Sequence, residues 1–133
     1  MTTKKAQDIA FGLNSEEEMI NILNAKFNTK VRKLEKYNVF DFETKTRLIE
    51  LKSRKNLSTK YPTTMIGNNK IIEAEKQNKK VYFVFKFTDS IKYIRYNKSL
   101  FDKFQRRVGG RSDINCIESN TYCHIPIHEL KDL

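Results

Sequence analysis

The chain has little glycine, proline or cysteine, and each shortage excludes a class of protein. Four glycines and two prolines in 133 residues exclude a fibrous or low-complexity protein. Two cysteines are too few for a disulfide framework, so we expect free thiols in a reducing compartment. No apolar run approaches the roughly 18 residues of a membrane span, and residues 1–6 contain no signal-peptide core. We therefore expect an intracellular protein, in cytoplasm, nucleus or a host cell if viral, that is neither secreted nor bound to a membrane.

What is present is enough for one folded domain, and it carries a strong positive charge. The length fits a single domain over 1–133, and 38% of the residues are hydrophobic, including nine Phe and six Tyr. Basic residues outnumber acidic ones by 26 to 16, which gives a net charge of +10. Such an excess indicates a polyanionic partner, most simply nucleic acid. A solubilising surface explains the composition equally well.

The apolar pattern of the N-terminal half predicts two helices with strands between them. A stripe in residues 15–27 indicates the first helix, which starts there or earlier, near Lys5, and stops at Asn28. Pro62 could open a second helix that runs to about Lys79. The segments between them that have strand character are 30–37, 39–44 and 47–54. A tight polar turn joins the last two, which indicates a hairpin.

The C-terminal half predicts further strands. Residues 81–87 are almost continuously apolar and aromatic, as expected for a central strand buried on both faces. We then expect a neighbouring strand, a short helix, a basic loop and a last strand, at 91–97, 99–104, 105–111 and 121–127. Pro126 in the last of them indicates a sheet edge. The fold class is α/β, a central mixed sheet flanked by helices in the order α-β-β-β-α-β-β.

An acid interrupts the apolar strand of the predicted hairpin. Glu50 lies among apolar residues, and Lys52 shares its face of the strand because side chains alternate. If Lys45 and Thr46 form a two-residue turn, Asp41 faces Glu50 directly. Two carboxylates about 5 Å apart repel each other, and burial increases that cost. A divalent cation such as Mg²⁺ would reverse it.

The hairpin therefore predicts a metal site with Asp41 and Glu50 as ligands and Lys52 beside it. A protonated Lys52 cannot bind metal, but it can orient an attacking water, lower its pKa or stabilise charge on a phosphorane-like transition state. A plain cross-strand Glu-Lys pair on a solvated face is the alternative. Glu43 could be a ligand if the turn slipped by two residues.

At these residues the sequence resembles the PD-(D/E)xK nuclease superfamily, and within it the archaeal-type Holliday junction resolvases. The run "ELKSRK" at 50–55 is similar to the end of the resolvases' motif strand. The spacing of their first helix is matched by Gly12, Glu16, Met19 and Ile20. Phe40 stands where these families usually have proline.

This resemblance implies a restriction-endonuclease-like core and a DNA endonuclease that depends on Mg²⁺, with Mn²⁺ as a possible substitute and no small-molecule cofactor. Glu16 would help to hold the metal directly or through water, and Glu17 is the alternative helix acid. Branched or structured DNA would suit a homodimer that cuts two strands symmetrically. The alternatives are a repair, nicking or restriction-type nuclease on linear DNA and a non-catalytic nucleic-acid-binding module with the same fold.

Basic and polar residues beyond the motif strand are candidates for contacts with the DNA backbone. One group leads from the strand into the predicted second helix, whose first free N–H groups suit phosphate. Its members are Arg54, Lys55, Lys60, Tyr61, Thr63, Thr64 and Lys70. Those of the basic loop are Arg106, Arg107 and Arg111. Solvated loops are the alternative in both places.

A zinc site is a poorer explanation than burial for the group Cys116, Cys123, His124 and His128, whose spacing fits no common closed site.

Overall fold

The structure, a computed structural model, centres on a six-stranded mixed sheet with the order β1-β2-β3-β5-β6-β9. It describes the backbone of residues 4–36, 38–109 and 121–133, and side chains within these ranges from residue 16 onward. The strands are Arg32–Lys33, Phe42–Glu43, Arg47–Ser53, Lys80–Lys86, Ile91–Arg95 and Lys131–Asp132. β3 and β5 run parallel, and the other neighbours run antiparallel. The predicted mixed central sheet is confirmed.

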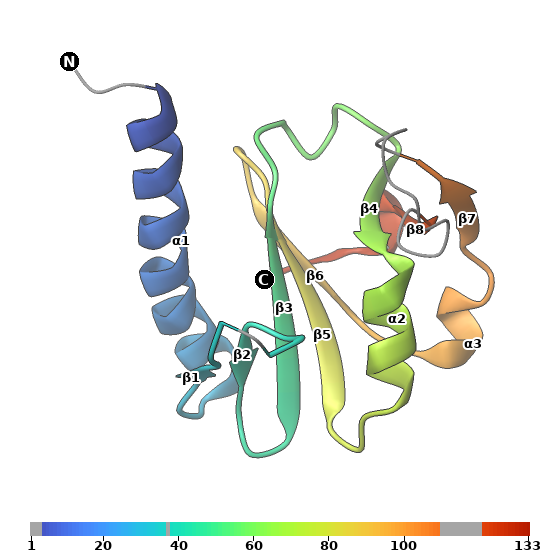
Figure 1. Cartoon of the computed structure of the whole chain (residues 1–133), viewed down its shortest axis with the longest axis horizontal. Coiled ribbons are helices and arrows are strands. Elements are labelled where there is room, and N and C mark those ends of the chain that lie inside the picture. Colours follow the sequence, from blue (N-terminus) through green and yellow to red (C-terminus); the bar gives the residue numbers. More distant parts are fainter. Residues whose placement is uncertain (1–3, 37, 110–120) are drawn as a thin grey trace.

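Helices cover both faces of this sheet (Figure 1). α1, Lys4–Phe27, packs Met19 and Leu23 against one face, and α2, Asn68–Glu75, packs Ile71 and Ala74 against the other. β5 between them is buried over five consecutive residues, which confirms the predicted central strand. Among the described helices, none is long and apolar enough to cross a membrane.

The first helix begins early and ends where the sequence predicts. α1 starts at Lys4, in agreement with the earlier of the two predicted starts. Asn28 follows the last helical residue with φ 49°, the left-handed conformation that ends many helices. The next two strands are shorter than predicted, since only Arg32–Lys33 and Phe42–Glu43 pair regularly.

A second sheet, with the order β4-β8-β7, was not predicted. It consists of Thr63–Gly67, Thr121–Pro126 and Gln105–Val108, all antiparallel. Figure 1 shows it beside α2, on the side of the main sheet away from α1. The short helix α3, Lys98–Phe101, and the 3-10 turn Ile127–Glu129 connect it to the main sheet.

This second sheet corrects three expectations. The helix expected to start at Pro62 is wrong in its first part, because alternately buried residues of Thr63–Gly67 form β4 against β8. The loop expected at 105–111 is strand β7 as far as Val108. Pro126 does not mark an edge, because β8 is the middle strand and Pro126 is its last residue.

Candidate active site

The β2–β3 hairpin has the predicted register. Phe42 pairs with Ile49 and Glu43 with Leu48, and the N–H of Thr44 donates to the carbonyl of Arg47 at 2.9 Å. The buried Thr44 hydroxyl accepts hydrogen bonds from the N–H groups across the turn, which stabilises it. The two-residue turn is thereby confirmed, and the register that slips by two residues is not the one observed.

Asp41 departs from the regular ladder, and this departure directs its carboxylate. Its N–H donates to the Ile49 carbonyl at 3.0 Å, although Phe42 is the register partner of Ile49. Two residues opposite one is the pattern of a β-bulge, which commonly re-aims a side chain beside a functional site. Asp41 Oδ2 accepts a hydrogen bond from the N–H of Leu51 at 2.8 Å. The carboxylate is therefore anchored on β3, next to Glu50.

Glu50 is buried, with 3% of its surface exposed. Its pKa is raised to about 7, first by burial and then by the hydrogen bond and charge of Asp41, against the opposing effects of Lys70 and Lys52. Its Oε2 atom has no hydrogen-bond partner among the described residues. A buried carboxylate beside a second carboxylate is a position that a bound cation would stabilise.

Two lysines approach Glu50 from different elements. Lys52, two positions along β3, is partly exposed, and its charge lowers the pKa of Glu50. Lys70, on the first turn of α2, places its Nζ 2.8 Å from Glu50 Oε2, as an ion pair without hydrogen-bond geometry, and also donates to the carbonyl of Val39. Lys70 was predicted to contact DNA phosphate. That role stays a prediction, and the structure places the ammonium group of Lys70 beside Glu50, a position that only the packing of α2 reveals.

Glu16, on α1, lies near Asp41. Glu16 and Asp41 line a cavity of about 150 Å³ together with Phe42, Leu51 and Ser53. Lys33 Nζ lies 2.5 Å from Glu16 Oε2, and this hydrogen bond and charge raise the pKa of Lys33. Glu17 is exposed to solvent. Between the two predicted helix acids, Glu16 is the one near Asp41.

The donor set suits a cation held by two carboxylates. Within the described part of the chain, no three Asp, Glu, His or Cys side chains converge as a group that could hold a metal ion. Asp41 and Glu50 do approach each other, and Mg²⁺ is commonly held by one or two carboxylates, with waters and phosphate oxygens completing its shell. The residues present therefore fit Mg²⁺ through Asp41 and Glu50, while Glu16 shares a cavity with Asp41.

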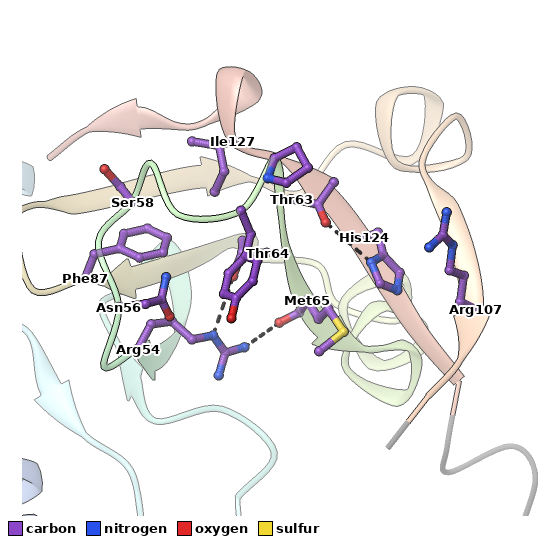
Figure 2. Close-up of a pocket in the computed structure, with 12 residues that line it drawn as sticks. Arg54, Asn56, Ser58, Thr63, Thr64, Met65, Phe87, Arg107, His124 and Ile127 are labelled. Atoms are coloured by element: carbon purple, nitrogen blue, oxygen red, sulfur yellow. Dashed lines mark hydrogen bonds between the residues drawn. The ribbon is translucent and has the colours of Figure 1, made fainter. Parts of the chain in front are cut away.

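Five of the predicted DNA contacts gather around one larger cavity of about 470 Å³. These residues are Arg54, Tyr61, Thr63, Thr64 and Arg107. Figure 2 shows Arg54 on one side of the cavity and His124 and Arg107 on the other. Thr63 and Thr64 belong to strand β4, so the expected contact through a helix N-terminus is wrong for them. Sequence analysis missed the second sheet and therefore missed this cavity.

The remaining predicted contacts are scattered. Lys55 and Lys60 are exposed near the end of β3, which leaves their role a prediction. Arg106 donates to Asn68 Oδ1 and to the carbonyls of Phe101 and Phe104, each at 2.9 Å. These bonds tie β7 to α2 and α3 and favour a structural role over phosphate contact. Arg111 lies outside the described residues.

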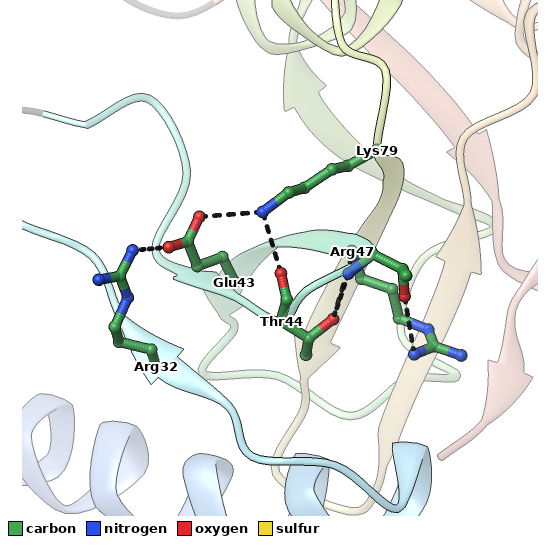
Figure 3. A network of polar contacts seen from close by, with 6 residues as sticks. Arg32, Glu43, Thr44, Arg47 and Lys79 are labelled. Atoms are coloured by element: carbon green, nitrogen blue, oxygen red, sulfur yellow. Dashed lines mark hydrogen bonds and ion pairs between the residues drawn. The ribbon is translucent and has the colours of Figure 1, made fainter.

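Glu43, the alternative ligand, is engaged elsewhere (Figure 3). It forms ion pairs with Arg32 and with Lys79, the latter at 3.3 Å. Lys79 also donates to the carbonyl of Thr44 at 3.0 Å. This network fastens β1 and the start of β5 to the hairpin, so Glu43 acts as a link between strands in this structure.

Among the described residues, the surroundings of these cysteine and histidine side chains do not favour a zinc site. Cys123 is fully buried in the apolar core, where burial raises the pKa of its thiol, in agreement with its expected role as a small hydrophobe. His124 contacts Thr63 and His128 lies near Glu129. Cys116 lies outside the described residues.

Comparison with known proteins identifies the family. Residues 3–133 match the family described as "Phage putative PDDEXK endonuclease". No curated protein matches the sequence. PD-(D/E)xK families typically use divalent metal and have a restriction-endonuclease-like fold, in agreement with the paired acids and the mixed sheet. Because the match covers almost the whole chain, the protein belongs to the phage PDDEXK endonucleases, a family of DNA nucleases.

Proposed function

We propose that this endonuclease hydrolyses phosphodiester bonds in branched or structured DNA, with Mg²⁺ held by Asp41 and Glu50. The observation that carries the proposal is the buried Glu50, whose pKa is raised to about 7 and whose carboxylate lies beside that of Asp41. A purely structural role does not explain a buried Glu50 beside a second acid, because the repulsion between the two carboxylates destabilises the fold.

Each residue of the site has a distinct task in this proposal. The bulge and the N–H of Leu51 hold Asp41 in place, and β3 holds Glu50, so both ligands are positioned before DNA arrives. The metal, when bound, supplies Lewis acidity toward the phosphate and lowers the pKa of water. Lys52 orients the attacking water and stabilises charge that develops on the phosphate. Lys70 offsets the charge of Glu50 when no metal is present.

The preference for branched or structured DNA rests on the resemblance to junction resolvases and on the open cavity beside β3. A homodimer would present two such sites for symmetric cutting. A nicking or restriction-type enzyme on linear duplex is the rival within the family. A cleavage assay in Mg²⁺ on matched linear duplex, single-stranded, flap and four-way junction DNA separates them, since fastest cutting of the linear duplex would overturn the preference.

Lys52→Ala tests the chemistry itself. We expect the single-turnover cleavage rate to fall by at least roughly 100-fold, because the lysine acts on the water or the transition state. Affinity for DNA, measured in Ca²⁺, should change by no more than a few fold. Lys45→Ala, an exposed lysine at the turn of the same hairpin, is the control and should cleave normally. Unchanged cleavage by Lys52→Ala would show that β3 does not carry the active site.

A further inference from the structure

The cavity in Figure 2 opens beside the candidate active site and is not used by the proposed chemistry. Lys52 and Arg54 lie two positions apart at the end of β3, a separation of about 7 Å along a strand. Arg54 and Met65 line this cavity and also a smaller one that includes Lys52. The two hollows are therefore neighbours, and Arg54 lies between them.

The lining combines groups that suit a phosphate with groups that suit a planar ring. The Arg54 guanidinium is oriented by the carbonyl of Met65 and the hydroxyl of Thr64, and Arg107 is exposed on the opposite side. Both cations favour an anionic ligand. Tyr61 is 55% exposed and offers an aromatic face, and Phe87 forms part of the wall. Cation and aromatic ring together are the usual elements of a site for unpaired nucleotides.

His124 adds a group that can hydrogen-bond without adding charge. Burial lowers its pKa, and the charge of Arg107 lowers it further, so the imidazole is neutral at physiological pH. A neutral imidazole has one donor and one acceptor nitrogen. Thr63, whose hydroxyl lies 3.5 Å from His124 Nδ1, and Asn56 supply further polar atoms on the wall. These groups match the polar edge of a nucleobase better than they match an aliphatic ligand.

We propose that this cavity receives one unpaired base of the DNA strand, from a nucleotide next to the scissile phosphate, which lies beside Lys52. Arg54 and Arg107 contact the phosphates that flank this base. The proposal rests on the nuclease function proposed above and narrows its substrate. The cavity volume of about 470 Å³ falls within the range of small-molecule sites, which is roughly 300–1,000 Å³. A base in a continuous duplex must leave its stack to enter. The favoured substrates are therefore flaps, bubbles and junctions with unpaired nucleotides.

Binding in EDTA tests this without cleavage. Three labelled DNAs are compared by fluorescence anisotropy: a duplex, the same duplex with a two-nucleotide bubble, and that bubble with abasic residues at its unpaired positions. We expect the wild type to bind the bubble about tenfold more tightly than the abasic bubble, because a stacked base contributes roughly that much. Tyr61→Ala should lose this preference, and Tyr61→Phe should keep it. Ile72→Ala, an exposed apolar residue of α2 outside the cavity, is the control.

The outcomes separate the two proposals. Equal affinity of the wild type for both bubbles, or an unchanged preference in Tyr61→Ala, would overturn the base site whether or not the protein cleaves DNA. A preference that depends on Tyr61 in a protein that never cleaves with Mg²⁺ would support the base site and overturn the proposed chemistry. Failure to bind any of the three DNAs, in Ca²⁺ as well as in EDTA, would overturn the base site, and the cleavage assay in Mg²⁺ decides the chemistry separately.

Discussion

At the scale of single residues, Glu50 links stability to metal binding. Its pKa is about 7 in the folded protein, against an ordinary value of 4.5, because burial and Asp41 outweigh the two lysines. Between these values the folded protein holds a proton that the unfolded chain has released. Stability therefore falls as the pH rises through this interval, and the full cost is present above pH 7.

Replacement of Glu50 by Gln should remove this cost in metal-free protein. We expect Glu50→Gln to be more stable than wild type by roughly 3 kcal/mol at pH 8, with the difference disappearing toward pH 4.5. Urea unfolding in EDTA from pH 5 to pH 8 measures it, with the exposed Glu17→Gln as control. Mg²⁺ should stabilise only the wild type at pH 8. Parallel pH profiles of wild type and Glu50→Gln would contradict the burial of an ionised Glu50.

At the scale of elements, the C-terminal half of α1 packs against the sheet. Leu23 is fully buried against the face that Ile49 and Val84 share. Leu23→Ala should lower the free energy of unfolding by about 2–5 kcal/mol, because it removes transfer energy and leaves a cavity. Asn21→Ala, on the exposed side of the same helix, should change it by less than about 0.5 kcal/mol. Denaturant unfolding that gave equal values for the two variants would show that α1 does not pack as described.

At the scale of the whole molecule, the net charge of +10 should govern DNA affinity. Each phosphate neutralised by Lys or Arg releases a counterion, so about six contacts would weaken binding roughly 1,000-fold between 50 and 200 mM salt. Lys60→Ala should reduce the slope of log affinity against log salt by about one if Lys60 contacts phosphate. Titration of a four-way junction in Ca²⁺ at several salt concentrations measures both. A salt-independent affinity would mean that the charge serves solubility alone.

Local patterns in the sequence were sufficient for the hairpin and the central strand. The turn and the alternation of β3 depend on neighbouring residues, so the register of the hairpin, in which Phe42 pairs with Ile49, could be predicted from them. The apolar run of β5 likewise predicted a strand buried on both faces. The extra N–H contact of Asp41 could not be predicted, because a bulge changes one hydrogen bond without changing the pattern of apolar residues.

Tertiary packing decided the rest of the site. Thr63–Gly67 is a strand because β8, more than fifty residues later, pairs with it, and the nearby Pro62 gave a misleading helix signal. With that segment extended, α2 begins only at Asn68, and its first turn brings Lys70 to Glu50. The same pairing places Arg54, Tyr61 and His124 around one cavity. Contacts between segments so distant in the chain are set by which surfaces bury each other, and no local periodicity encodes that choice.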